Sequence, residues 1–117
     1  MNRVAIYAAI AAASTSAMLP GTAHAQVGET VAQFYKSCRA EGGRVNGRCD
    51  SYIEGAADTL AAFGKGGNAN GICGGGYNKG ELSRIFMAWV PKNRNTWGFP
   101  RLAGVTIALR EAYPCRR

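Results

Sequence analysis

Few residues of this chain could do chemistry, and two carboxylates stand out by their spacing. Glu54 and Asp58 lie four residues apart, which places both on one face of a helix, where they could act as a general acid and base. A structural interpretation competes, because Glu54 also completes a capping box that begins at Ser51. No nucleophile or histidine of the mature chain completes a catalytic site around them. We therefore interpret the pair as structural and predict that the protein is not an enzyme.

Residues 1–25 have the pattern of a secretory signal peptide. A short basic start precedes an apolar stretch over residues 4–13, and Ala23-His24-Ala25 supplies the small residues that signal peptidase recognises. The apolar stretch is well short of the roughly 20 residues that cross a bilayer, so a membrane anchor is the weaker interpretation. We expect cleavage after Ala25, a mature domain over residues 26–117, and a periplasmic location without membrane insertion. Cleavage also removes the single histidine.

The four cysteines all lie in the mature part, at Cys38, Cys49, Cys73 and Cys115. None shows the C-x-x-C spacing of a zinc knuckle, and we expect neither a metal nor a cofactor. An even number of cysteines in an exported chain favours two disulfides, for which three pairings are formally open. We favour Cys38 with Cys49 and Cys73 with Cys115, because the predicted helices place each pair at adjoining element ends.

Four stretches show the periodicity of amphipathic helices. The predicted helices cover residues 29–41, 51–64, 78–90 and 100–113, and no stretch alternates as a strand would. In the last helix, the predicted inward positions are Leu102, Val105, Leu109, Ala112 and Tyr113. Because 47% of the residues are hydrophobic and 18% are charged, the chain can form a packed core. We therefore predict an all-α class, a small four-helix domain stapled by two disulfides.

The net charge of +7 comes from 14 basic and 7 acidic residues. The basic residues are dispersed, with no run longer than two, whereas nucleic-acid binding concentrates charge on one surface. We therefore expect no nucleic-acid partner. A solvated basic surface and a surface for an acidic protein partner remain the two interpretations of this charge.

From Cys38 onward, several segments in a fixed order carry a family resemblance. They are Cys49-Asp50-Ser51-Tyr52-Ile53-Glu54-Gly55 with Asp58, then Cys73, then Gly80-Glu81-Leu82, then Pro100, and finally Ala108-Leu109-Arg110-Glu111-Ala112-Tyr113-Pro114-Cys115. In these motifs the chain resembles the periplasmic immunity proteins of type VI secretion systems, of the Rap/Tai type. The resemblance covers nearly all of the mature chain.

The resemblance implies a small, disulfide-bonded, helical non-enzyme that binds a secreted peptidoglycan amidase effector and blocks it. Partner-facing loops of such proteins enter or cover the catalytic groove of the effector, and several of the proteins act as homodimers. The chain departs from the family pattern over residues 74–78 and 93–97. These differences lie where an immunity protein could vary to match a different effector, so the identity of the partner stays open.

The residues that we predict to contact the partner lie in the two irregular connections between helices. They are Lys65, Asn68, Asn70 and Tyr77 in the first connection, and Lys92, Arg94, Asn95 and Trp97 in the second. Tyrosine, tryptophan and arginine are over-represented among interface anchors, although Tyr77 and Trp97 could equally pack on the domain itself.

Three residues of the family motif have structural roles in our interpretation. Tyr52 and Asp58 are expected to tie the second helix to its neighbours, and Gly55 to permit a close approach by a neighbouring group. A different class of function, a small periplasmic acid-stress chaperone similar to the HdeA type, is the alternative. Two disulfides and few titratable acids argue against it.

Overall fold

Residues 28–39 and 44–116 are described by a computed structural model, and they fold into four α-helices. The helices are α1 (Val31–Cys38), α2 (Gly47–Gly64), α3 (Lys79–Trp89) and α4 (Arg101–Ala112), with two 3-10 turns, η2 (Val90–Lys92) and η3 (Arg94–Thr96), before α4. The only strand-like pairings among the described residues are isolated bridges, Thr30 with Pro100 and Arg39 with Val45. The predicted all-α class is confirmed. The predicted signal peptide lies outside the described residues.

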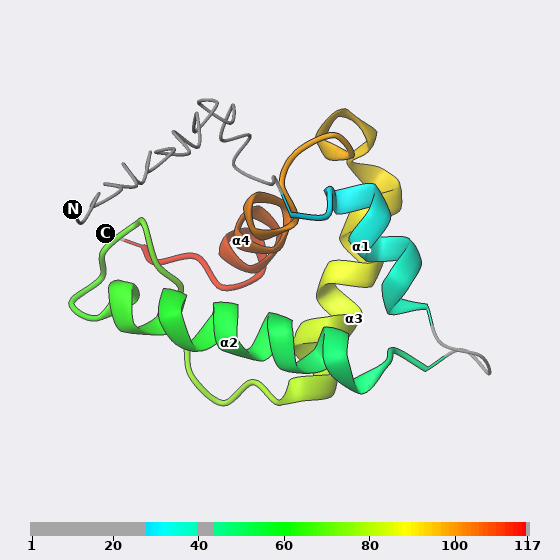
Figure 1. The fold of residues 1–117 in the computed structure, drawn as a ribbon. Coiled ribbons are helices and arrows are strands. Elements are labelled where there is room, and N and C mark those ends of the chain that lie inside the picture. Colours follow the sequence, from blue (N-terminus) through cyan, green and yellow to red (C-terminus); the bar gives the residue numbers. More distant parts are fainter. Residues whose placement is uncertain (1–27, 40–43, 117) are drawn as a thin grey trace, which may run out of the picture.

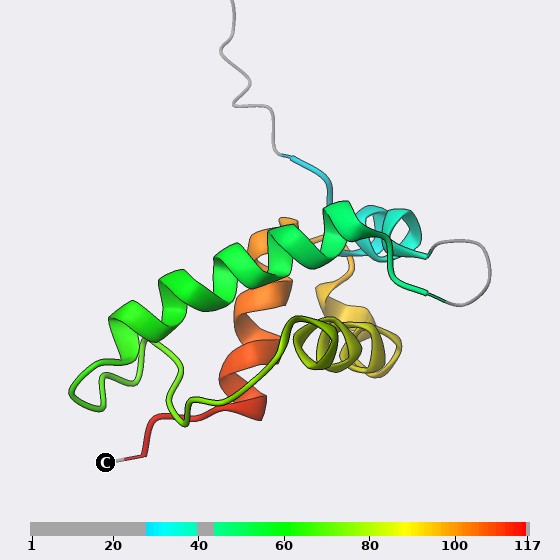
Figure 2. The same cartoon turned by 90° about the horizontal axis from the view of Figure 1, so that it is seen from below.

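The long helix α2 lies along the lower side of the molecule in Figure 1, with α4 above it, and in the view of Figure 2 α4 crosses behind α2. Helix α3 packs against both α2 and α4, and α1 packs against α4 and α2. Each helix turns its apolar stripe toward this centre, where the largest fully buried side chains are Phe86, Ile53, Leu82, Leu109, Val31, Val90 and Val105. None of the helices in the described part of the chain has the length and apolar content that a membrane span requires.

Both favoured disulfides are present, so the predicted pairing is confirmed. Cys38 at the end of α1 is bonded to Cys49 in the first turn of α2, and Cys73 in the connection after α2 is bonded to Cys115. The second bond joins residues 42 positions apart, against 11 for the first. Together they tie α1 to α2 and the long glycine-rich connection to the end of the chain.

The start of α2 differs from the prediction. The helix begins at Gly47 rather than near Ser51, because the Asn46 side chain accepts the backbone N–H of Cys49 at 2.8 Å and so acts as the N-cap. Ser51 therefore lies inside the helix, where its hydroxyl donates to the carbonyl of Gly47. The capping box predicted there is wrong. A capping box is formed instead at the start of α1, between Thr30 and Gln33.

Helix α4 is rotated relative to the predicted inward face. Its buried stripe consists of Gly104, Val105, Ala108 and Leu109. A Cβ at Gly104 would collide with Cγ2 of Val31, so the glycine lets α4 pack closely on α1. Since successive residues turn about 100° around a helix, this stripe leaves Leu102 about a quarter turn from its centre. The inward positions predicted for Leu102 and Ala112 are wrong, because both side chains are exposed.

Candidate partner-binding surface

A groove of about 630 Å³ lies between α2 and α4. The residues that line it are Ser51, Tyr52, Gly55, Ala56, Thr59, Leu60, Phe63, Asn70, Leu102, Thr106 and Arg110. Most of its surface is apolar. The hydroxyls of Ser51 and Thr59 donate to carbonyls one turn earlier in their own helix, so these two polar groups are already engaged. The groove therefore offers shape and apolar area more than free hydrogen-bonding groups.

Two large apolar side chains that line the groove are exposed to solvent. Phe63 is 59% exposed at the end of α2, and Leu102 is 52% exposed in the first turn of α4. Burying apolar area against a partner yields about 25 cal/mol per Å², which makes exposed side chains of this size effective anchors. Exposed apolar residues that gather around a hollow, rather than scattering singly, mark an interaction surface.

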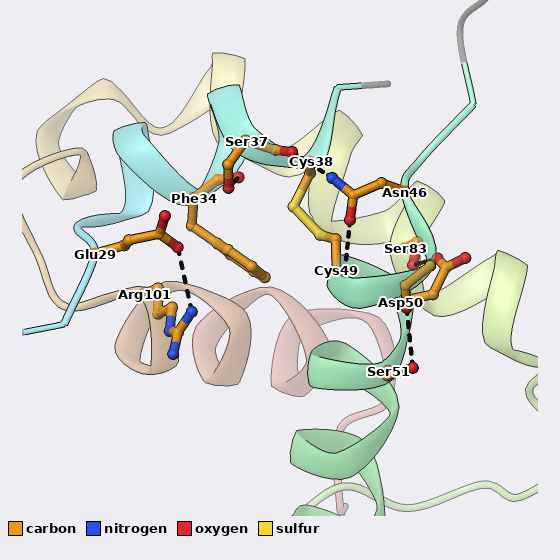
Figure 3. Close-up of a disulfide and its surroundings, with 11 residues drawn as sticks. Glu29, Phe34, Ser37, Cys38, Asn46, Cys49, Asp50, Ser51, Ser83 and Arg101 are labelled. Atoms are coloured by element: carbon orange, nitrogen blue, oxygen red, sulfur yellow. Dashed lines mark hydrogen bonds and ion pairs between the residues drawn. A yellow bond between two sulfur atoms is a disulfide. The ribbon is translucent and has the colours of Figure 1, made fainter. Parts of the chain in front are cut away.

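A second, polar pocket of about 210 Å³ adjoins the start of the groove. It is lined by Glu29, Phe34, Ser37, Asn46, Arg48, Cys49, Tyr52 and Arg101. Figure 3 shows it beside the first disulfide, with Asn46 reaching from the start of α2 toward the end of α1, where its amide also donates to the carbonyl of Ser37. Tyr52 lines both the pocket and the groove, so the two form one continuous surface along α2.

Arg101 lies in the polar pocket against Tyr52, the residue that the pocket shares with the groove. Its guanidinium carbon lies 4.1 Å from the ring centroid of Tyr52 and 5.4 Å from that of Phe34. A guanidinium nitrogen also lies 3.2 Å from a carboxylate oxygen of Glu29, and the backbone N–H of Arg101 donates to the carbonyl of Glu29. These contacts join α4 to α2, to α1 and to the residues before α1, and they hold the guanidinium in place beside Glu29 at this end of the groove.

The opposite end of the groove carries a second fixed arginine. Nε of Arg110 donates to the backbone carbonyl of Asn70 at 2.9 Å, and a second guanidinium nitrogen donates to the same oxygen. Arg110 is the charged member of the groove lining, and Arg48, Arg101 and Glu29 are those of the polar pocket. Because Glu29 is paired with Arg101, the combined surface is basic.

The first group of predicted contact residues lies in the connection after α2. Lys65, Asn68 and Asn70 are exposed, and of the three only Asn70 lines the groove. Tyr77 packs on the domain, with its ring centroid 5.2 Å from that of Tyr113. Burial, followed by the charge of the Asp58 carboxylate, raises the pKa of the Tyr77 phenol. Tyr77 is therefore part of the packing at this end of the domain.

The second group lies in the connection before α4. Arg94 and Asn95 are exposed, and Trp97 is 38% exposed while its indole N–H donates to the carbonyl of Val90 at 2.9 Å. Arg94 lies over the Trp97 ring, 5.5 Å from its centroid. Lys92 instead borders a shallow hollow between α3 and α4.

The structure does not bring the two groups together. The carbonyls of Trp97 and Phe99 accept the first N–H groups of α1, so the second connection lies beside the start of α1 and directly before the start of α4. Cys73 donates its N–H to the carbonyl of Tyr113, which places the first connection at the end of α4. A helix of this length separates the two connections by about 18 Å. The groove runs between them.

The three residues of the family motif, Tyr52, Gly55 and Asp58, differ in their structural surroundings. Tyr52 contacts Phe34 edge to face at 5.0 Å as well as Arg101, and thus links α2 to α1 and α4. Asp58 is exposed on α2 and acts on Tyr77 through its charge. The close approach expected at Gly55 is absent among the described residues, none of which has an atom within 4 Å of a Cβ built there. Gly55 lies instead on the open wall of the groove.

The two spaced carboxylates do not form a joint site. Glu54 pairs with Lys79 of α3 at 3.3 Å, and Asp58 is exposed one turn further along α2. Neither borders the groove or the polar pocket. Within the described ranges, no cluster of three or more His, Cys, Asp or Glu side chains could hold a metal ion.

Four exposed or charged residues of this surface are not among the predicted contact residues, namely Phe63, Leu102 and Arg110 of the groove and Arg101 of the polar pocket. One signal was available for Phe63, which lies outside the helical stripe formed by Ile53, Ala57 and Leu60. Leu102 gave no such signal, because it falls on the edge of an apolar stripe whose centre only the packing of Gly104 determines.

Comparison with known families gives one match. A family model described as Rap1a immunity proteins matches residues 30–115, a range that contains all four helices and both disulfides. No curated protein and no solved structure matches the chain.

Proposed function

The chain belongs to the Rap1a immunity protein family, and we propose that it binds and inhibits a peptidoglycan amidase delivered by type VI secretion, so that the cell is protected from its own effector. The match over residues 30–115 carries this proposal. The motifs that resemble the Rap/Tai type lie within the same range of residues. Because that resemblance implies an amidase as the effector, it supports the choice of an amidase here. The partner in this proposal is a protein, bound in a stoichiometric complex.

The features of the site favour binding over catalysis. The surface of the groove is mostly apolar, with Arg110 as its charged residue, and in the polar pocket Arg101 is already paired with a carboxylate. Neither presents the nucleophile and base, or the carboxylate pair, that hydrolysis requires. A basic and apolar surface of this kind suits recognition of an acidic protein.

The proposed place of action is the periplasm. The leader pattern over residues 1–25 supports export, and the two disulfides support an oxidising compartment, where such bonds persist. Formation of a homodimer is part of the same proposal, and sedimentation velocity of the mature protein tests it.

The experiment that tests the function uses the secreted amidase encoded beside this protein. Residues 26–117 are purified with both disulfides formed, mixed with the amidase, and assayed for hydrolysis of peptidoglycan and for complex formation by calorimetry. We expect inhibition that reaches completion near one immunity protein per amidase. Hydrolysis that continues unchanged in excess protein, with every secreted amidase of the same cell, would refute the proposal.

A further inference from the structure

The geometry points to the groove between α2 and α4 as the docking site for a helix of the effector. The helix would have three turns, an apolar face and a carboxylate near each end. This inference rests on the proposed function and adds to it the surface used and the chemistry of the segment that occupies it. It also differs from the expectation that the loops make the contact, because the groove is built from helix faces.

Gly55, in the middle of α2, leaves open space on the wall of the groove. Glycine inside a helix is unfavourable relative to alanine, and it is commonly retained where another group needs the space. At Gly55 no group of the described chain uses that space, since a Cβ would meet no atom within 4 Å. Gly55 lies on the wall of the groove between Tyr52 and Thr59. The space above it is therefore available to another molecule, whose backbone could approach α2 closely.

The walls of the groove determine the conformation of its occupant. Both walls are α-helices, whose backbone N–H and C=O groups are bonded within the helix, so they cannot pair with an extended strand. An occupant must satisfy its own backbone, as a helix does. The lining extends from Ser51 to Phe63, which corresponds to about 18 Å along α2 at 1.5 Å per residue. That length accommodates about three helical turns.

The arginines around the groove indicate which charges the two ends of the docked helix should carry. Arg48 and Arg101 line the polar pocket that adjoins the start of the groove, and Arg110 lines the groove itself, as do the exposed side chains of Phe63 and Leu102. Arg101 and Arg110 are nine positions apart on α4, which corresponds to about 13 Å. A helix with apolar residues on one side and a carboxylate near each end would complement this arrangement. The glutamate of the surface, Glu29, is already paired with Arg101.

The same charges disfavour a second copy of this chain as the occupant. A two-fold interface places the same surface on both partners, so the arginines of one groove would face those of the other. The groove and the polar pocket together carry three arginines, and their one carboxylate, Glu29, is already paired with Arg101. Like charges across an interface cost binding energy, which leaves an acidic partner as the better complement.

The decisive experiment compares two glycine substitutions of the full mature protein. In Gly55→Ala the new methyl group lies in open space, and in Gly80→Ala it meets only the Asn78 side chain at an ordinary 3.7 Å. Both changes should raise the thermal unfolding midpoint, because alanine is the better helix former. Only Gly55→Ala should weaken binding of the amidase, by about tenfold, because the methyl group enters the space of the docked helix. Equal affinities for the two variants would overturn the docking site and leave the proposed function standing.

A second measurement does not depend on the amidase. A synthetic helix of about 14 residues carries leucines at i, i+3, i+4 and i+7 and glutamates at both ends, and a matched helix carries lysines in place of the glutamates. In NMR titrations the glutamate helix should shift the signals of Gly55, Thr59 and Thr106, and the lysine helix should bind about tenfold more weakly. Absence of binding, or equal binding of both helices, would count against the inference. If no amidase binds the protein but the glutamate helix does, the proposed function fails and the groove stands.

Self-association is the third outcome. If wild-type protein dimerises in sedimentation velocity and Gly55→Ala, but not Gly80→Ala, abolishes the dimer, then a second copy occupies the groove and the inference is wrong.

Discussion

The guanidinium of Arg101 stacks on the ring of Tyr52, with 4.1 Å between its central carbon and the ring centroid. This contact joins the first residue of α4 to the first half of α2, and Tyr52 is the residue that lines both the groove and the polar pocket. Tyr52 belongs to the segment that carries the family resemblance, so the motif contributes to the candidate surface as well as to the packing.

Loss of the Arg101 side chain should destabilise the domain moderately. Arg101→Ala removes two cation–π contacts and the ion pair with Glu29, all partly exposed to solvent. We expect the free energy of unfolding in urea to fall by about 1 kcal/mol. The matched control is Arg84→Ala, since Arg84 is exposed and makes no ion pair with a described residue. A loss of equal size in both variants would mean that the stacking contributes nothing.

The number and approximate extent of the helices could be predicted from the sequence, because each helix carries an apolar stripe of the right period. The exact start of α2 could not. The sequence predicts the cap at Ser51, whereas Asn46 caps the helix. Asn46 forms the cap because its amide also donates to the carbonyl of Ser37, across the loop that the first disulfide closes. A contact between separate elements is not visible in local sequence.

Substitutions at these two positions should have unequal effects. Asn46→Ala removes the acceptor of the Cys49 N–H and the link to Ser37, and should lower the free energy of unfolding by about 1–2 kcal/mol. Ser51→Ala removes only a bond between the hydroxyl and a carbonyl of its own helix, and should change stability by less than about 0.5 kcal/mol. Urea unfolding of both variants measures the difference. The reverse order would restore Ser51 as the cap.

The orientation of α4 was also beyond local pattern. Both Leu102 and Val105 fit an apolar stripe, and the sequence alone cannot say on which of them the stripe is centred. The close packing of Gly104 on Val31 decides it, because it turns that side of α4 toward α1 and leaves Leu102 over the groove. The exposure of Leu102 on the candidate surface therefore depends on a tertiary contact. The two connections that hold the predicted contact residues lie at the two ends of α4.

Gly104→Ala tests this packing. The added Cβ would overlap the fully buried Val31, and overpacking of a core costs about 1–3 kcal/mol, against a gain of about 1 kcal/mol in helix propensity. We expect a lower thermal unfolding midpoint. The double variant Gly104→Ala with Val31→Ala should have a higher midpoint than Val31→Ala alone, because the overlap is removed and part of the gain in helix propensity is recovered. A higher midpoint for Gly104→Ala alone would show that α4 does not depend on the glycine.

The two disulfides should differ in their accessibility to reductant. Cys38 and Cys49 are 0% and 2% exposed, whereas Cys73 and Cys115 are partly exposed near the surface. Under native conditions and mild reductant, Cys73 and Cys115 should therefore be alkylated first, with Cys38 and Cys49 protected until the domain unfolds. Mass spectrometry of alkylated peptides over time gives the order. Simultaneous alkylation of all four cysteines would contradict it.

The two bonds should also differ in their contribution to stability. In the loop-entropy model, a bond across 42 positions stabilises by about 4 kcal/mol and one across 11 positions by about 3 kcal/mol. Replacement of Cys73 and Cys115 by serine should thus lower the free energy of unfolding by about 4 kcal/mol. Unfolding in urea that is unchanged from wild type would mean that the glycine-rich connection needs no covalent tie.

Stability should fall at alkaline pH because of the paired rings of Tyr77 and Tyr113. Burial is the main cause that raises the pKa of both phenols above 10.0, with added contributions from the carboxylates of Asp58 and Glu81 respectively. The Tyr113 hydroxyl is buried without a hydrogen-bond partner among the described residues, so nothing there stabilises a phenolate.

A group whose pKa is higher in the folded state stabilises the fold fully below its unfolded pKa. That contribution is then lost as the pH rises from about 10 through the folded pKa. We expect the urea midpoint to be flat between about pH 8 and pH 9 and to decline above pH 10, more steeply in wild type than in Tyr113→Phe, which has no proton to lose. A decline of equal steepness in the two proteins would assign the alkaline loss to groups other than Tyr113.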